Sequence, residues 1–164
     1  MGEQKKSRLQ RICNIATYVV LAGIILCALI LLGVSLIAVM MLVDPSLTLD
    51  GMDRNELFFL IIASAINQVI SIALFYYLMK LTKSIGHESS PFTSANVRLL
   101  KLMAVILLIG WVFAMAVEVI ITALWELEST GLNVDALVMA GIIYVISLVF
   151  EYGVRLQEES DGFV

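Results

Sequence analysis

Charged side chains are scarce in this chain of 164 residues. Asp, Glu, Lys and Arg together account for 15% of it and apolar residues for 61%, with a mean hydropathy of +1.01. A soluble domain has about 25% charged and about 45–50% apolar residues, so this composition excludes an ordinary soluble protein. The net charge of -4 also argues against direct nucleic-acid binding, which requires a basic face.

Residues that carry catalytic or metal chemistry are equally few. His87 is the single histidine, and the two cysteines, Cys13 and Cys27, form no CxxC pair or other metal-ligand spacing. Neither Ser89 nor Ser90 has the partners that would make it a nucleophile. We therefore expect no enzyme activity, no cofactor and no metal site. The cysteines lie about 21 Å apart along one helix, too far for a disulfide, and are expected to pack.

Long apolar runs are what the chain has in abundance. Four of them are predicted to be transmembrane helices, over residues 15–43, 57–79, 102–125 and 134–150. A helix needs about 20 apolar residues to cross the hydrocarbon layer, and only the fourth run, with 17, is shorter. The predicted fold class is all-α: a polytopic membrane protein with four transmembrane helices in a bundle. Residues 1–164 then form a single membrane domain, with a cytoplasmic loop at 80–101 and a cytoplasmic tail at 151–164.

Local signals predict where these helices begin and end. Pro45 disfavours the helical conformation at Asp44, so the first helix is predicted to stop there. Residues 53–56 resemble a capping box before the second run. Thr93 is the predicted N-cap of a helix that continues into the third run, and Asn133 has the same role before the fourth.

Positive charges are segregated along the chain. Arg54 is the only Lys or Arg residue in the first or third loop. The other nine are Lys5, Lys6, Arg8, Arg11, Lys80, Lys83, Arg98, Lys101 and Arg155. Because Lys and Arg favour the cytoplasmic side, we expect both termini in the cytoplasm, in a plasma or bacterial inner membrane. A cleaved signal peptide is the alternative for the N-terminus, but its apolar core would have about 7–15 residues and the first run has 29.

Glu118 is the one acidic residue inside the third run. A carboxylate disfavours membrane insertion, so we expect it to face the bundle interior and a polar partner. At 1.5 Å per residue, Asn67 and Gln68 of the second run lie within about 5 Å of the membrane depth of Glu118. Gly110 and Ala114 continue a small-residue stripe to Glu118, which favours close helix approach. These polar residues form a candidate intramembrane site, either a contact between helices or a site for a ligand or ion.

The second loop and the tail are expected to emerge on one membrane face. Arg98 and Lys101 precede the third run, whereas the tail is acidic, so the two segments have opposite charge. Phe92 and Leu156 are expected to supply most of the apolar contact between them. The candidate docking surface comprises Pro91, Phe92, Thr93, Asn96, Arg98, Gly153, Leu156, Gln157 and Asp161. Such a surface could receive a cytoplasmic regulator or close the inner end of the bundle.

Two motifs give these segments a recognisable form. Pro-Phe-Thr-x-x-Asn-Val follows Gly86 in the loop, and Phe-x-x-Gly-x-x-Leu-Gln-x-Glu-x-Asp begins at Phe150. Together with the four runs they resemble the YoaS-like bacterial membrane family, a group of unknown function. Its members are often encoded beside a small helix-turn-helix regulator, so the resemblance implies a membrane partner of a transcription factor. The chain departs from the family pattern in the polar insert after Gly86 and at Gly162–Phe163.

The leading interpretation is therefore a non-enzymatic integral membrane protein that regulates a partner through its cytoplasmic loop and tail. The expected partner is a helix-turn-helix transcription regulator. The runner-up is a small transporter or permease component that uses the polar site around Glu118, and a membrane enzyme ranks third. The lipid bilayer is the surrounding medium, a homo-oligomer is left open, and no direct contact with nucleic acid is expected.

Overall fold

A computed structural model describes residues 2–44, 54–87, 90–125 and 134–161. These ranges form four α-helices: α1 (Gly2–Val43), α2 (Arg54–His87), α3 (Ser94–Trp125) and α4 (Asp135–Asp161). No strand occurs in the described ranges, so the predicted all-α class is confirmed. At 1.5 Å per residue, α1 is about 63 Å long and α4 about 40 Å.

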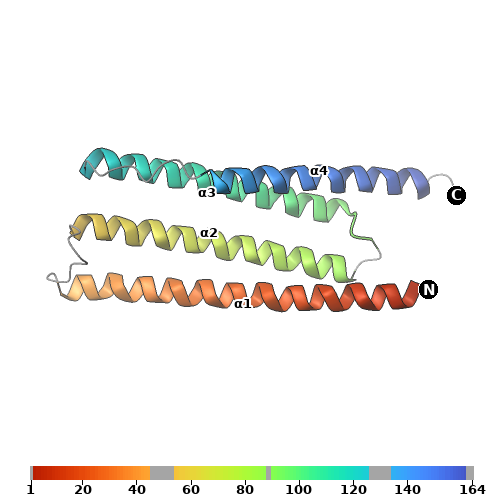
Figure 1. Ribbon diagram of the computed structural model, residues 1–164, viewed down its shortest axis with the longest axis horizontal. Coiled ribbons are helices and arrows are strands. Elements are labelled where there is room, and N and C mark those ends of the chain that lie inside the picture. Colours follow the sequence, from red (N-terminus) through yellow and green to blue (C-terminus); the bar gives the residue numbers. More distant parts are fainter. Residues whose placement is uncertain (1, 45–53, 88–89, 126–133, 162–164) are drawn as a thin grey trace.

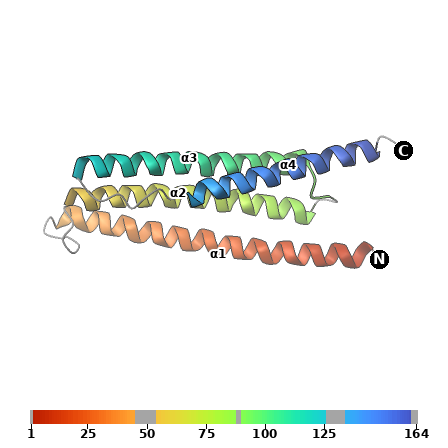
Figure 2. The ribbon, with the colours of Figure 1, turned by 45° about the horizontal axis from the view of Figure 1, so that its top comes forward.

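The helices lie side by side in an open arrangement (Figures 1 and 2). α1 packs on α2, α2 on α3 and α3 on α4. Among the described residues, α1 contacts neither α3 nor α4. The start of α1, the end of α2, the start of α3 and the end of α4 share one end of the molecule, here called the terminal end (Figure 1). The bundle therefore has no common core of four helices, and α1 lies at one edge of it.

Each helix contains a segment long and apolar enough to cross a membrane, at Gln10–Val43, Leu57–Gly86, Ser94–Leu124 and Asp135–Ser160. Large apolar side chains on these segments are exposed, such as Leu29 at 59% and Ile109 at 62%. Exposed apolar surface on this scale is not stable in water and is what lipid tails cover. The four candidate spans indicate a multi-pass membrane protein.

Several helix ends differ from the prediction. The helix α2 continues to His87, so the first part of the expected loop at 80–101 is helical. The start of α3 at Ser94, directly after Thr93, agrees with the predicted cap. The expected tail is helical as well, because α4 continues to Asp161. In both places the sequence becomes polar where the apolar run ends. Polar residues mark the end of the segment that can cross the membrane, but the helix itself continues through them. The first helix does stop at Val43, just before Asp44 and Pro45 as predicted, whereas residue 53 and Asn133 lie outside the described ranges.

The contact between α1 and α2 has a seven-residue period. The buried apolar residues of α1, among its described side chains, are Cys13, Val20, Cys27 and Met41, at spacings of seven or fourteen. That period is typical of two helices that coil around each other. Both cysteines are buried and unbonded, so the prediction that they pack is confirmed.

Burial on α3 is concentrated toward the terminal end. Among the side chains of α3 that the structure describes, the buried ones are Asn96, Val97, Leu100, Met103 and Ala104, all within its first eleven residues. On α4 the buried residues are Ala140 and Ser147, again seven apart. Ser147 is fully buried, and its hydroxyl donates to the Tyr144 carbonyl at 2.6 Å, so it leaves no donor unpaired. The predicted docking residues at the start of α3 therefore lie next to the best-packed part of this helix.

Candidate functional site

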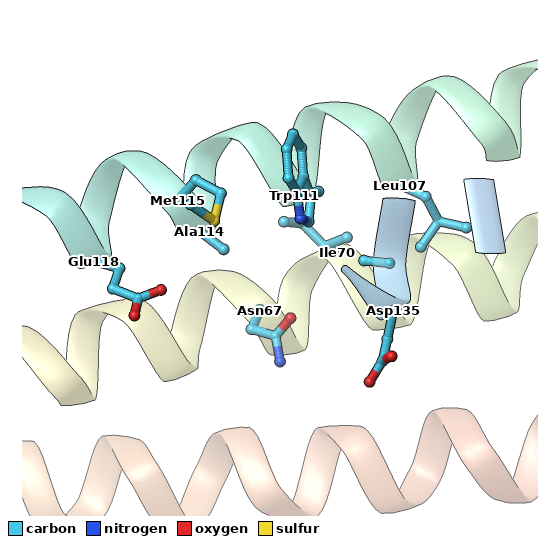
Figure 3. A pocket seen from close by; sticks show the side chains of 10 residues that line it. Asn67, Ile70, Leu107, Trp111, Ala114, Met115, Glu118 and Asp135 are labelled. Carbon is cyan, nitrogen blue, oxygen red and sulfur yellow. The ribbon is translucent and has the colours of Figure 1, made fainter. Parts of the chain in front are cut away.

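A cavity of about 380 Å³ lies between α2, α3 and the start of α4 (Figure 3). Most of its walls are apolar, from Ile70, Leu107, Gly110, Ala114, Met115 and Ala136. Four lining residues have polar groups: Asn67 on α2, Trp111 and Glu118 on α3, and Asp135 on α4. A mostly apolar cavity with a few convergent polar groups is typical of a small-molecule site.

The spacing of small residues on α3 explains why Glu118 faces this cavity. Gly110, Ala114 and Glu118 are four residues apart and therefore share one helix face, the face toward α2. The closeness of the two helices depends on Gly110, where an added Cβ would lie 3.2 Å from Ile70 Cδ1. The structure thus places Glu118 and Asn67 at one cavity, whereas Gln68 is half-buried and is not among its described lining residues.

Asp135 is a lining residue that the sequence analysis missed. It is the first residue of α4 and lies near the start of the fourth apolar run, where the sequence analysis assigned it no role. Its position in the first turn is favourable, because the N-terminal end of a helix stabilises negative charge. The sequence does show one acid in each of two apolar runs, Glu118 and Asp135. It does not show that they line one cavity, because that depends on the register of α4 against α3.

The polar groups of this cavity are suited to binding a polar or cationic group. Two carboxyl groups and one amide can accept hydrogen bonds or contact a cation, and Trp111 adds an aromatic wall. Glu118 and Asp135 each have an interaction partner in the structure. The described residues contain no group of three His, Cys, Asp or Glu that could hold a metal ion.

A second candidate site lies at the terminal end, where the segment before α3 packs on the last part of α4. We call it the loop–tail cluster: Ser90, Phe92, Asn96, Phe150, Gly153 and Gln157. The ring of Phe92 meets that of Phe150 edge to face, with centroids 5.3 Å apart. It also lies directly over Gly153, where an added Cβ would be 2.5 Å from Phe92 Cδ1. Gly153 is therefore the residue that lets Phe92 approach the helix.

Polar contacts join the same two segments. The Ser90 hydroxyl donates to Gln157 Oε1 at 2.8 Å and accepts from the Phe92 N–H at 3.2 Å. About two helical turns into α3, the Lys101 ammonium donates to Glu151 Oε2 at 2.8 Å. Arg155 also contacts Glu151, at 3.4 Å. Apolar and charged contacts thus hold the end of α4 against the start of α3.

The start of α3 has the predicted cap. Thr93 Oγ1 accepts a hydrogen bond from the Asn96 N–H at 3.3 Å, and the Thr93 carbonyl accepts one from Val97 at 3.1 Å. The Asn96 side chain is fully buried and donates from Nδ2 to the Pro91 carbonyl at 2.9 Å. Its Oδ1 has no hydrogen-bond partner. Asn96 therefore fixes the turn at Pro91 at the cost of one unpaired acceptor.

The remaining predicted docking residues lie at the edge of this cluster. Arg98 is exposed, and Leu156 is 48% exposed, so Leu156 does not supply the apolar contact expected of it. Phe150 and Gly153 provide that contact instead, because the Phe92 ring meets the ring of Phe150 and lies over Gly153. The side chain of Asp161 lies outside the described residues.

The fold and the two candidate sites define an all-helical, multi-pass membrane protein. The chain belongs to the family described as "Protein of unknown function (DUF2975)", whose sequence model matches residues 49–163. The expectation of an unknown-function family is thereby confirmed, and the YoaS-like subgroup stays a prediction. No curated protein and no solved structure matches the chain. The matched residues include both candidate sites and exclude α1.

Proposed function

We propose that this chain is a non-enzymatic membrane regulatory protein that binds a cytoplasmic partner through the loop–tail cluster and the end of α4. The observation that carries the proposal is the ordered contact of Phe92 with Phe150 and Gly153, joined by the hydrogen bond from Ser90 to Gln157. A surface that is already ordered before binding loses less conformational entropy when a partner binds.

The end of α4 offers this partner both apolar and acidic groups. Tyr152 is 64% exposed and Leu156 48%, and Glu158 and Glu159 follow on the exposed last turns. The last turn of α4 has no basic residue, and acidic groups there are unfavourable because the helix C-terminus is itself negative. A basic partner surface would relieve this repulsion. Helix-turn-helix regulators have such a surface, the basic face that binds DNA, so the end of α4 would compete with DNA for it.

The same proposal places the terminal end in the cytoplasm of a bacterial cell, at the inner membrane. It rests on the segregation of Lys and Arg, which favours the cytoplasm for the end where nine of the ten lie. The cluster would then project from the membrane on the side where transcription regulators are found.

Copurification from cells tests this function. The full chain, a form without residues 154–164, and the double variant Glu158→Lys/Glu159→Lys would be expressed at equal, correctly inserted levels. We expect one DNA-binding protein to copurify with the full chain and to be lost from both altered forms, because each removes the acidic end of α4. Recovery of the same proteins with all three forms would exclude this surface as the binding site.

The cavity around Glu118 supports a second candidate function, a small transporter or permease component. The supporting observation is that Asn67, Glu118 and Asp135, from three helices, line one space. Glu118→Gln separates this role from a contact between helices, because an amide still forms hydrogen bonds. Transport requires that the variant folds but loses ion or solute flux in proteoliposomes. A purely structural Glu118 predicts unchanged behaviour in the Gln variant and a loss of about 1–2 kcal/mol or less in Glu118→Leu.

A further inference from the structure

A second, smaller cavity of about 250 Å³ lies between α1 and α2 at the terminal end. It is lined by Gln10, Asn14 and Thr17 on α1 and by Thr82, Lys83 and Gly86 on α2, together with Cys13. In contrast to the cavity around Glu118, most of its lining side chains are polar, and none of the described ones is acidic. Neither candidate function described above uses it.

The two helices close around this cavity through small residues. An added Cβ at Gly86 would lie 3.0 Å from Cys13 Cβ, so the helices are in direct contact there. The hydroxyl oxygens of Thr17 and Thr82 lie 3.3 Å apart and join the helices one turn further in. Gln10, Asn14 and Lys83 then supply amide and ammonium donors around the space.

This cavity lies at the level where both apolar runs end. On α1 the run begins at Ile15, next to Asn14, and on α2 it ends at Met79, one turn before Lys83. Lipid headgroups occupy that level of a membrane. The exposed bases Arg8, Arg11 and Lys80 are in the same segments, so the local potential favours an anion.

We propose that this cavity binds the phosphate of an anionic phospholipid headgroup. Lys83 contacts the phosphate, and the amides of Gln10 and Asn14 donate hydrogen bonds to its oxygens or to the glycerol headgroup. The acyl chains then run along the exposed apolar side of α1, where Ile15 is 57% and Val19 67% exposed. A polar, basic pocket between transmembrane helices at the membrane surface has the chemistry that recognises such headgroups.

Lipid binding to the full chain in neutral detergent tests the assignment. The probes are dioctanoyl phosphatidylglycerol, dioctanoyl phosphatidylcholine and inorganic phosphate, with binding measured by native mass spectrometry. Lys83→Gln should weaken phosphatidylglycerol binding about tenfold, because a hydrogen bond to a charged group is lost. Asn14→Leu, which leaves the net charge unchanged, should weaken it as well, and Lys83→Arg should preserve it.

Lys80→Gln is the matched control, since Lys80 is exposed on the same helix, carries the same charge and is not among the described lining residues. It should change binding by no more than about twofold, because Lys80, although exposed like Lys83, is not among the described lining residues and adds only a screened long-range attraction. Equal losses in the two glutamine variants would overturn the proposal in favour of diffuse attraction to the basic surface. Phosphatidylcholine binding as tightly as phosphatidylglycerol would overturn it too. Inorganic phosphate that displaces the lipid at equal concentration would assign the cavity to a free anion and overturn the lipid assignment.

Discussion

Gly153 shows how one residue can decide the shape of the terminal end. Its missing side chain leaves the space that Phe92 fills, and an added Cβ would be only 2.5 Å from that ring. The sequence places Gly153 and Phe92 in two separate motifs, and both were predicted to belong to one surface. Their direct contact could not be predicted, because it depends on the rotation of α4 about its axis, which the residue pattern of the tail does not specify.

Gly153→Ala is predicted to destabilise the protein by about 1–2 kcal/mol. The added methyl group overpacks the ring contact at a cost of about 1–3 kcal/mol, and the higher helix propensity of alanine returns up to about 1 kcal/mol. Thermal unfolding of the purified protein in detergent measures the difference.

Gly141→Ala is the matched control for this change. It lies in the same helix with nothing within 4 Å of the added Cβ, so it should be neutral or stabilising. In a Phe92→Ala background the cost of Gly153→Ala should disappear, because the clashing ring is absent. A cost that persists in that background would show that Phe92 is not the cause.

At the scale of helices, the apolar runs predict the number and order of the elements but not all of their ends. The end of α1 at Val43 follows from Pro45, whose effect is local. The ends of α2 and α4 do not follow from hydropathy, since both helices continue into polar sequence. The start of α4 lines the same cavity as Trp111 and Ile70. Hydropathy does not predict this position either, because the register of α4 along α3 is determined by contacts between the helices.

The α2–α3 contact is predicted to depend on Gly110. A leucine there would meet Ile70, whose Cδ1 already lies 3.2 Å from the position of a Cβ. Gly110→Leu should therefore destabilise the protein by about 1–3 kcal/mol. Gly33→Leu on α1 is the control, because nothing lies within 4 Å of that Cβ and the new side chain faces lipid. Thermal unfolding compares the two variants, and equal midpoints would mean that α2 and α3 are not closely packed at Gly110.

The end of α4 is predicted to be held in place by Ser90. Without the hydroxyl that donates to Gln157, Ser90→Ala should raise hydrogen exchange in residues 154–160 about fivefold, since one hydrogen bond contributes about 1 kcal/mol to local stability. Mass spectrometry of peptides from α4 measures the rate. Ser94→Ala, at an exposed position in the first turn of α3, should leave the rate unchanged. Matching rates in the two variants would remove Ser90 from the contact.

At the scale of the whole molecule, charges of opposite sign at the terminal end are separated between the α1–α2 pair and α4. Basic residues gather on the first turns of α1 and the last turns of α2, and acidic residues on the last turns of α4. Neither α1 nor α2 contacts α4 in the described ranges, so these bases do not neutralise the acids on the last turns of α4, whereas Lys101 of α3 pairs with Glu151. One edge of the molecule is thereby suited to anionic lipid and the other to a basic protein.

The shared position of the termini leads to a prediction about orientation in the membrane. The start of α1, the end of α2, the start of α3 and the end of α4 lie at the terminal end (Figure 1), where nine of the ten Lys and Arg residues also lie. Because Lys and Arg near span ends are retained on the cytoplasmic side, reporters fused at Thr48 and Thr130 should be outside the cytoplasm and a C-terminal reporter inside. Alkaline phosphatase and green fluorescent protein fusions at the three positions provide opposite signals and control for each other. A cytoplasmic reporter at Thr48 would reverse the orientation of all four spans and place the loop–tail cluster on the side without transcription regulators.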